Sequence, residues 1–166
     1  KRRSLWLGAN LLTAILAAAA IGLFEATIEK VVTLAILMPI VASMGGIAGM
    51  QSLALVIRSQ ALDQIGSSNS RLLIIKEASI GVLNGILWST VVALAVYLWF
   101  NSIFLGIVIA SALMINLIIG AISGVSLPLI LSKLKIDPAL AGGVILTTIT
   151  DIVGFISLLG IATLIM

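Results

Sequence analysis

The feature that most constrains the fold is a series of long apolar runs that charged residues rarely interrupt. These runs cover residues 4–24, 31–57, 78–132 and 138–166, and Asp151 is the one charge within the last of them. A helix needs about 20 mostly apolar residues to cross a bilayer, so each run can form at least one span. The run 78–132 is long enough for two, and Asn101-Ser102 after an aromatic pair is its natural break.

The fold predicted from these runs is an all-α, polytopic membrane protein with five transmembrane helices. The expected bounds are near 5–24, 31–57, 72–99, 103–131 and 138–165. The composition excludes the other classes, because 61% of the residues are hydrophobic and only 9% are charged. Soluble domains carry about 25% charged residues, and disordered chains are poor in hydrophobic ones. No second domain is expected within residues 1–166.

The distribution of Lys and Arg predicts the orientation in the membrane. With the N-terminus in the cytoplasm, eight of the nine basic residues fall inside, and only Lys30 falls outside. The eight are Lys1, Arg2, Arg3, Arg58, Arg71, Lys76, Lys133 and Lys135. Cytoplasmic loops carry an excess of Lys and Arg, so this arrangement is favoured. An odd number of spans then leaves the C-terminus outside.

The N-terminal segment has a second interpretation. Its three basic residues, apolar stretch and Ala17-Ala18-Ala19 resemble a secretory signal peptide with an A-x-A cleavage site. The apolar part of a signal peptide has about 7–15 residues, and this one is longer. Since four more spans follow, we interpret the segment as the first transmembrane helix.

The absence of His and Cys narrows the chemistry. Without them the chain cannot form imidazole or thiolate zinc sites, Cys nucleophiles, Ser-His-Asp triads or disulfides. The sequence therefore does not indicate an enzyme. The net charge of +3 follows from the topology of the basic residues, so we expect no nucleic-acid partner and take the lipid bilayer as the surroundings.

The second apolar run carries small and polar residues that a lipid-facing helix would not favour. Downstream of Pro39 it contains Gly45, Gly46 and Gly49, followed by Gln51. Glycines let helix backbones approach closely, so packing alone is one explanation. Irregular backbone at membrane depth also survives where it lines a cavity, and the amide of Gln51 favours that second explanation.

Two further polar groups have structural interpretations. Asn116, Gly120 and Gly124 recur every four residues and predict a helix-packing seam. Lys76 and Glu77 lie near the start of the third span, where we expect them at the cytoplasmic interface.

The fifth run contains the most informative residue, Asp151. It lies 13 positions after Pro138, which places it about 20 Å along a helix and well inside the hydrocarbon. Helical spacing puts Gly143, Thr147 and Gly154 on the same face. A carboxylate at this depth costs about 2.5–3.5 kcal/mol on insertion scales, so it indicates a functional site.

The other polar groups of the chain restrict the chemistry that this carboxylate can perform. Aspartyl proteolysis needs two carboxylates, and proton relays use chains of Asp, Glu or His. A carboxylate with Thr hydroxyls and backbone carbonyls suits a hard cation such as Mg²⁺, Ca²⁺ or Mn²⁺. The residues alone leave open whether the cation is divalent or monovalent.

Several motifs together resemble the MgtE family of magnesium channels and transporters. The two most specific are MPIVASMGGIAGMQSLALVIR at 38–58 and DPALAGGVILTTITDIVG at 137–154. The others, in the order expected for the family, are FEATIE after the first run, KEASIGVLNG at 76–85 and NLIIGAISGVSLPLIL at 116–131. The resemblance covers essentially all of residues 1–166 as the family's five-helix transmembrane domain.

The resemblance implies a bacterial cell (inner) membrane protein that forms a homodimer, with one ion path at the two-fold axis. Asp151 matches the aspartate of the pore, where two copies would face a hydrated Mg²⁺, and the backbone carbonyl of Thr147 would face the same ion. Asp137 matches an aspartate involved in metal-dependent gating. The remaining pore-lining matches and neighbours are Gly45, Gly46, Gly49, Gln51, Gly143 and Gly154. Transport of Mn²⁺ or Co²⁺ as well is left open.

The chain departs from the family pattern in three ways. Ile47 replaces the usual Asn, and Leu5 precedes Trp6 where the family typically has Pro. The cytosolic N-terminal and CBS regulatory domains of the family are absent from these residues, and the chain starts at Lys1 rather than Met, so we expect that they were removed or never present.

Two other functions stay open at this point. One is a proton- or sodium-coupled carrier of a small solute, with Asp151 as the coupling site. The other is a membrane anchor that transports nothing.

Overall fold

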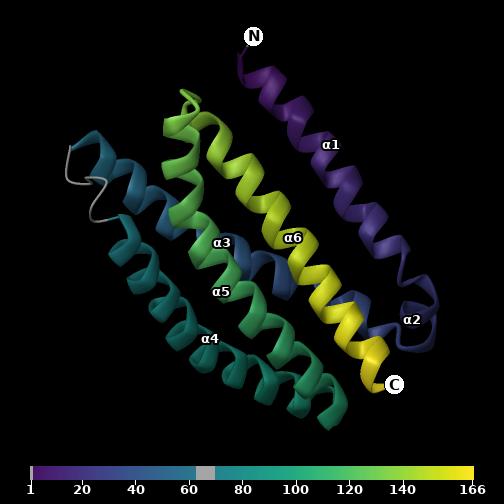
Figure 1. Cartoon of the computed structure of the whole chain (residues 1–166). Helices are drawn as coiled ribbons and strands as arrows, with labels where there is room; N and C mark the ends of the chain where they lie inside the picture. The colour runs from purple at the N-terminus through teal and green to yellow at the C-terminus, as the bar shows by residue number, and fades with distance from the viewer. Residues whose placement is uncertain (1, 63–69) are drawn as a thin grey trace.

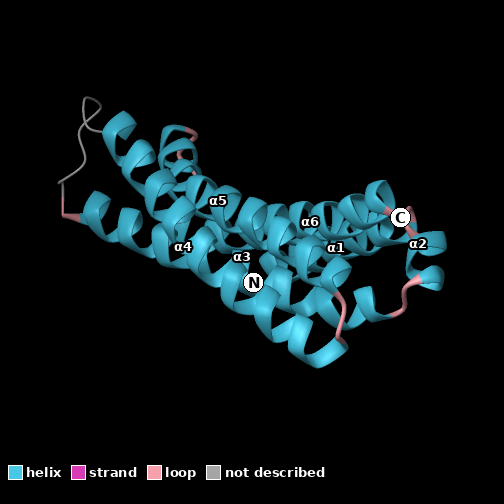
Figure 2. Cartoon of the chain, turned by 90° about the horizontal axis from the view of Figure 1, so that it is seen from below, coloured by secondary structure: helices cyan, strands magenta, loops and turns pink. Residues whose placement is uncertain are grey.

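The computed structural model describes residues 2–62 and 70–166, and these residues form helices joined by short turns (Figures 1 and 2). The helices are α1 (Arg2–Gly22), α2 (Glu25–Lys30), α3 (Thr33–Ala61), α4 (Ser70–Phe100), α5 (Ile103–Lys133) and α6 (Pro138–Ile165). All except α2 are long and apolar enough to cross a membrane. The predicted all-α fold with five candidate spans is therefore confirmed.

The turn between α4 and α5 lies where the sequence predicted a break in the longest apolar run. Asn101 has a φ of 49°, in the left-handed region that Asn tolerates better than most residues. The hydroxyl of Ser102 then accepts a hydrogen bond from the backbone N–H of Leu105 at 3.3 Å, which caps the start of α5. The two helices consequently run side by side in opposite directions (Figure 1).

The short helix α2 is an element that the apolar runs did not predict. It joins α1 to α3 and carries Glu25 and Glu29, both exposed. Its single buried residue, Thr27, shares a hydrogen bond of 2.7 Å with Thr163 near the end of α6. This contact fastens the α1–α3 connection to the C-terminal end of α6.

Helix α5 is the centre of the bundle and packs against α3, α4 and α6. It is the most buried of the candidate spans. One end of the bundle holds the main apolar core, built from α3, α5 and α6 with Val96 of α4. In contrast, α1 packs mainly on α6, and most of its side chains are exposed (Figure 1).

The contact between α3 and α5 is a seam of glycines. A Cβ atom on Gly120 would lie 2.6 Å from the carbonyl oxygen of Gly45, and one on Gly124 would overlap the carbonyl oxygen of Gly49. The two backbones therefore touch, with no room for side chains between them. The predicted packing seam of Asn116, Gly120 and Gly124 is confirmed, and its partners are Gly45 and Gly49.

Asn116 of α5 ties this seam to α3 by a hydrogen bond and packs against α6. Its side chain is fully buried, and its Nδ2 donates a hydrogen bond of 2.8 Å to the carbonyl oxygen of Val41. A Cβ atom on Gly45 would overlap this side chain, and one on Gly154 would lie 2.8 Å from Nδ2. The amide therefore occupies a slot between two glycines, one on α3 and one on α6.

Candidate cation site

Asp151 lies near the midpoint of α6. The helix begins at Pro138, after Asp137 caps it by accepting a hydrogen bond from the backbone N–H of Ala139 at 2.9 Å. At about 1.5 Å per residue, Asp151 is about 20 Å from this start, half-buried and within the candidate span. Its carboxylate forms no ion pair or side-chain hydrogen bond with the described residues. A deep, unpaired carboxylate of this kind is available to a cation.

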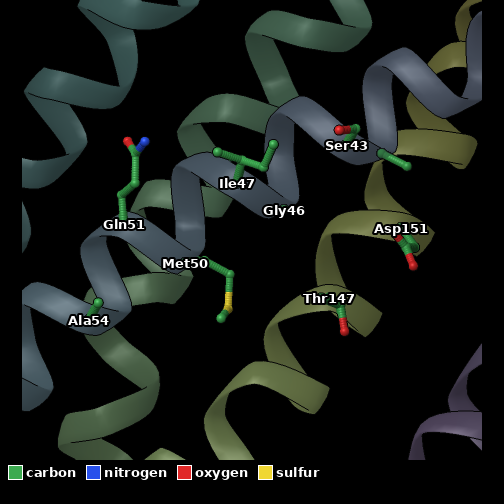
Figure 3. A pocket seen from close by; sticks show the side chains of 9 residues that line it. Ser43, Gly46, Ile47, Met50, Gln51, Ala54, Thr147 and Asp151 are labelled. Atoms are coloured by element: carbon green, nitrogen blue, oxygen red, sulfur yellow. The ribbon is translucent and has the colours of Figure 1, made fainter.

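The carboxylate faces a hollow of about 540 Å³ between α3 and α6 (Figure 3). Thr147 and Asp151 form the α6 side of the hollow, one helical turn apart. The α3 side consists of Ala42, Ser43, Gly46, Ile47, Met50, Gln51 and Ala54. The hollow is open to the surroundings of this single chain along one side, and its volume exceeds that of one ion with a shell of water.

The two walls of the hollow differ in chemistry. The α6 wall presents oxygen atoms, whereas the α3 wall is largely apolar, with an Ile47 side chain that is 55% exposed and a partly exposed Met50. Figure 3 shows Met50 pointing towards α6 and Gln51 pointing away from Thr147 and Asp151. Water and ions in the hollow therefore find hydrogen-bonding partners mainly on α6.

A second, smaller hollow reaches Asp151 from the side of α1. It has a volume of about 240 Å³, and its walls are Asn10, Thr13, Ala14, Thr147, Thr148 and Asp151. Asp151 and Thr147 thus belong to both hollows. Asn10 and Thr13 were not among the predicted site residues, although two polar residues three positions apart in an apolar run were a signal that could have identified them.

The predicted site residues separate into two groups in this chain. Gly46, Gln51, Thr147 and Asp151 line the larger hollow. Gly45 and Gly49 face α5 in the glycine seam, and Gly154 packs against Asn116. For both groups, lining of a pore stays a prediction.

Gly143 and Asp137 lie farther along α6 towards its start. A Cβ atom on Gly143 would be in ordinary contact with Met50, at 3.7 Å from its Sδ and Cε atoms, so it is close to one end of the hollow. Asp137 is exposed and about 20 Å from Asp151 along the helix. The structure therefore brings Gly143 near the hollow and leaves Asp137 at the end of α6.

Thr147 already uses its hydroxyl within the helix. This hydroxyl donates to the carbonyl oxygens of Gly143 and Val144, at 3.0 and 3.1 Å, and the Thr147 carbonyl accepts from the hydroxyl of Thr150 at 3.1 Å. A carbonyl oxygen has two lone pairs, and a hydroxyl oxygen that donates can still accept. Thr147 can therefore face a hydrated ion as an acceptor next to the carboxylate.

The donor set within one chain is one carboxylate with neutral oxygens. Among residues 2–62 and 70–166, no group of three or more carboxylates could hold a metal ion. Oxygen donors are those that hard cations prefer, and Mg²⁺ usually keeps several waters while one or two carboxylates contact it. The set suits a hydrated cation that passes through better than a tightly held resident metal.

Among the described residues, five helices are long and apolar enough to span a membrane, and one of them carries an unpaired carboxylate near its midpoint. These features define a multi-pass membrane protein with a polar site suited to cations. Residues 38–161 match the family model of MgtE, which is described as a divalent cation transporter. The chain belongs to the MgtE family. It is therefore a member of a family of transport proteins rather than enzymes, which agrees with the prediction from sequence.

Three curated relatives support this membership, and each is called magnesium transporter MgtE. The protein from Bacillus subtilis is 39% identical over 162 residues, which are 98% of this chain. The proteins from Thermus thermophilus and Enterococcus faecalis are 30% and 28% identical, over 97% and 99% of this chain. The chain spans 36% of the length of each of these relatives.

Proposed function

We propose that residues 1–166 form the membrane domain of a magnesium channel or transporter, which passes hydrated Mg²⁺ into the cell down its electrochemical gradient. The family membership and the shared name of the three relatives support Mg²⁺ as the transported ion. Mn²⁺ and Co²⁺ have similar coordination preferences and are further candidates for transport.

The observation that carries this proposal is the position of Asp151. An unpaired carboxylate in the middle of a bilayer costs about 2.5–3.5 kcal/mol on insertion scales, so its presence needs a compensating role. Asp151 lies on a hollow of about 540 Å³ with the oxygens of Thr147 beside it. A cation passing through the hollow would remove the electrostatic cost each time that it binds.

The charge of the ion favours a two-fold symmetric site. One Asp151 carries one negative charge, whereas Mg²⁺ carries two positive charges. In a homodimer whose axis passes along the open side of the hollow, two Asp151 carboxylates would balance the ion without removing its water shell. The apolar wall of α3 makes few hydrogen bonds to water, so the two α6 helices would be the main contacts of the hydrated ion.

The direction of transport follows from the proposed orientation. With the N-terminus in the cytoplasm, Lys133, Lys135 and Asp137 lie at the inner end of the path. Moving two positive charges inward gains about 4.6 kcal/mol per 100 mV of inside-negative potential. The potential alone can thus drive uptake. On this orientation the exposed Asp137 would lie on the cytoplasmic side, and we propose that it senses cytoplasmic Mg²⁺ and contributes to gating.

The decisive experiment is Mg²⁺ flux into proteoliposomes with an inside-negative potential. Asp151→Asn removes the charge but keeps the size of the side chain, so we expect flux to fall at least tenfold. Glu29→Gln, an equivalent change on the exposed face of α2, is the matched control and should keep full flux. Unchanged flux in the Asp151→Asn protein would reject the proposed pore. Uptake that requires a pH or sodium gradient would favour a coupled carrier instead.

The dimer can be tested by cross-linking, because the chain has no native Cys. Ile47→Cys introduces a single thiol on the wall of the hollow, and we expect mild oxidation in membranes to produce a covalent dimer. Leu83→Cys places a thiol on the exposed face of α4 as the control and should stay monomeric. Cross-linking at position 83 without cross-linking at position 47 would place the dimer axis elsewhere.

A further inference from the structure

We propose that a polar pocket enclosed by α3, α4 and α5 around Glu77 is a second cation site, which binds one Na⁺ ion per chain. It is separate from the hollow at Asp151 and does not depend on the function proposed for that hollow. The pocket has a volume of about 130 Å³, shares only Gln51 with the lining of the hollow at Asp151, and contains one carboxylate among neutral oxygens.

Glu77 is the unexpected residue of this pocket. The sequence predicted it at the membrane interface, yet its side chain is only 7% exposed. The hydroxyl of Ser52 on α3, itself buried, donates a hydrogen bond of 2.7 Å to Oε2 of Glu77. The carboxylate therefore points from α4 into the bundle rather than out to water.

The other carboxylate oxygen, Oε1, is free to bind a ligand. No described residue donates a hydrogen bond to it, and no Lys or Arg of the described residues forms an ion pair with Glu77. Among the described residues, Asn116 Oδ1 is the only side-chain nitrogen or oxygen atom that is fully buried and has no hydrogen-bond partner. Oε1 of Glu77 has no partner either, so it cannot be fully buried. Oε1 consequently retains accessible surface, and Glu77 is one of the residues that line the pocket.

A buried carboxylate with one hydrogen bond and no positive partner is costly. Removing an ionised group from water without a partner costs free energy, so buried charges are usually paired or bind metals. The walls around Glu77 supply no charge: they are Ala48, Gln51, Ser52, Leu55, Ile80, Gly81, Asn84, Leu117 and Ala121. A cation from solution would provide the missing compensation.

The neutral oxygens of the pocket favour a metal cation over a bare proton. Gln51 and Asn84 each contribute an amide, and Ser52 contributes a hydroxyl. Gln51 lines both hollows, and Figure 3 shows that its side chain extends away from Thr147 and Asp151. A proton on Glu77 would need none of these groups, whereas a metal cation uses several oxygens together.

The charge of the pocket favours a monovalent ion. One carboxylate neutralises one positive charge, and a divalent ion here would keep a net positive charge within an apolar bundle. A cavity of about 130 Å³ has room for one ion with a few waters, since a water occupies about 30 Å³ in the liquid. Na⁺ with part of its water shell fits these limits.

The walls of the pocket are held in place by close helix packing. A Cβ atom on Gly81 would lie 2.9 Å from the Cβ of Ala121 and 3.3 Å from the Cα of Ile118, so α4 approaches α5 closely here. On the other side, Ser52 lies next to the glycine seam of α3 and α5. The backbones around Glu77 and Ser52 therefore have fixed positions, which lowers the cost of ordering these two side chains around an ion.

The test is binding of radioactive Na⁺ to the purified chain in lipid nanodiscs, without Mg²⁺. We expect saturable binding of one Na⁺ per chain. Glu77→Gln keeps the size and an acceptor for Ser52 but removes the charge, so it should weaken binding at least tenfold. Glu29→Gln should leave Na⁺ binding unchanged, and the Asp151→Asn protein, measured in the same way, should keep the Na⁺ that binds at Glu77, so failure of the proposed Mg²⁺ pore would be a separate result. Gel filtration and circular dichroism verify that each variant is folded.

A second variant keeps the proposal testable even when Glu77→Gln does not fold. Asn84→Asp adds a second carboxylate to the same pocket, and we expect it to change the preference of the site from Na⁺ to a divalent cation by tenfold or more. No saturable Na⁺ binding, binding that Asp151→Asn abolishes, or an unchanged preference in the Asn84→Asp protein would each overturn the proposal.

Discussion

The two faces of α3 show how one helix combines a rigid contact with an open one. Gly45 and Gly46 are neighbours in sequence, but a Cβ atom on Gly45 would overlap Asn116, whereas one on Gly46 would meet only Thr150 Oγ1 at 3.7 Å. The face towards α5 is closed backbone against backbone. The face towards α6 opens onto the hollow at Asp151.

The difference explains why glycine is used in two ways within a few residues. On the closed face it removes side chains so that α3 and α5 can touch, and this contact fixes the position of α3. On the open face it leaves space beside the carboxylate. A variant on the closed face should therefore change stability, and one on the open face should change transport with little effect on stability.

Gly124→Ala is the strongest test of the rigid contact between α3 and α5. The added methyl would overlap the carbonyl oxygen of Gly49 and lie 2.9 Å from the Cβ of Ser52, so the helices must separate. We expect a loss of about 3 kcal/mol in the free energy of unfolding, at the upper end of the usual range for overpacking. The three Trp residues allow thermal unfolding to be followed by intrinsic fluorescence in detergent. A melting temperature equal to that of the native chain would show that the seam is not rigid.

Asn116→Ala should have the next largest effect. It removes the hydrogen bond to the carbonyl of Val41 and leaves a small cavity between Gly45 and Gly154. The substitution also removes the enclosed Oδ1 that has no partner, which offsets part of the loss. We expect about 2 kcal/mol of destabilisation in the same unfolding measurement. Asn84→Ala, a partly exposed Asn on α4, is the matched control and should cost less than half as much.

Ile47→Asn tests the open face of α3, which lines the hollow. Ile47 is largely exposed on the hollow, so the change should alter the free energy of unfolding by less than about 0.5 kcal/mol. An amide there would add a hydrogen-bonding group to the apolar wall opposite Asp151. On the proposed function, we expect the Mg²⁺ concentration for half-maximal flux to fall severalfold. A large loss of stability would contradict the assignment of this face as open.

Gly46→Ala should have the smallest effect of all. The methyl group has ordinary contact distances on the hollow side, and Ala favours a helix over Gly. We expect a change in unfolding free energy within about 0.5 kcal/mol, against a clear loss for the adjacent Gly45→Ala. Equal destabilisation by the two variants would remove the distinction between the faces.

The elements of the fold followed from sequence because membrane-length helices leave a clear apolar signal. The expected span 103–131 corresponds to α5 at Ile103–Lys133, and the break at Asn101 is where the chain turns. The short helix α2 was missed since six residues with three charges carry no such signal.

The packing partners could be predicted only in part. The spacing of Asn116, Gly120 and Gly124 indicated a seam, but not that α3 would fill it. Glu77 was placed at the interface because it is near the start of a span. Its burial depends on Ser52 from another helix, which no local pattern along α4 contains.

The candidate site shows the same limit. The depth of Asp151 could be counted along one helix, so the sequence alone was enough to single it out. The helices that lie opposite Asp151 are determined by the tertiary structure, which no pattern along α6 contains. Asn10 and Thr13 of α1 joined the site for this reason, and Gly154, on the predicted face, instead packs against Asn116.

The apolar wall that Ile47 and Met50 form has a consequence for how the hollow fills. Water there hydrogen-bonds mainly to α6, so it is held from one side. Narrow hydrophobic constrictions in channels empty by dewetting. If ions pass through the hollow as proposed, a small change in the separation of α3 and α6 would decide between a wet, conducting hollow and a dry one that blocks ions without any plug of protein.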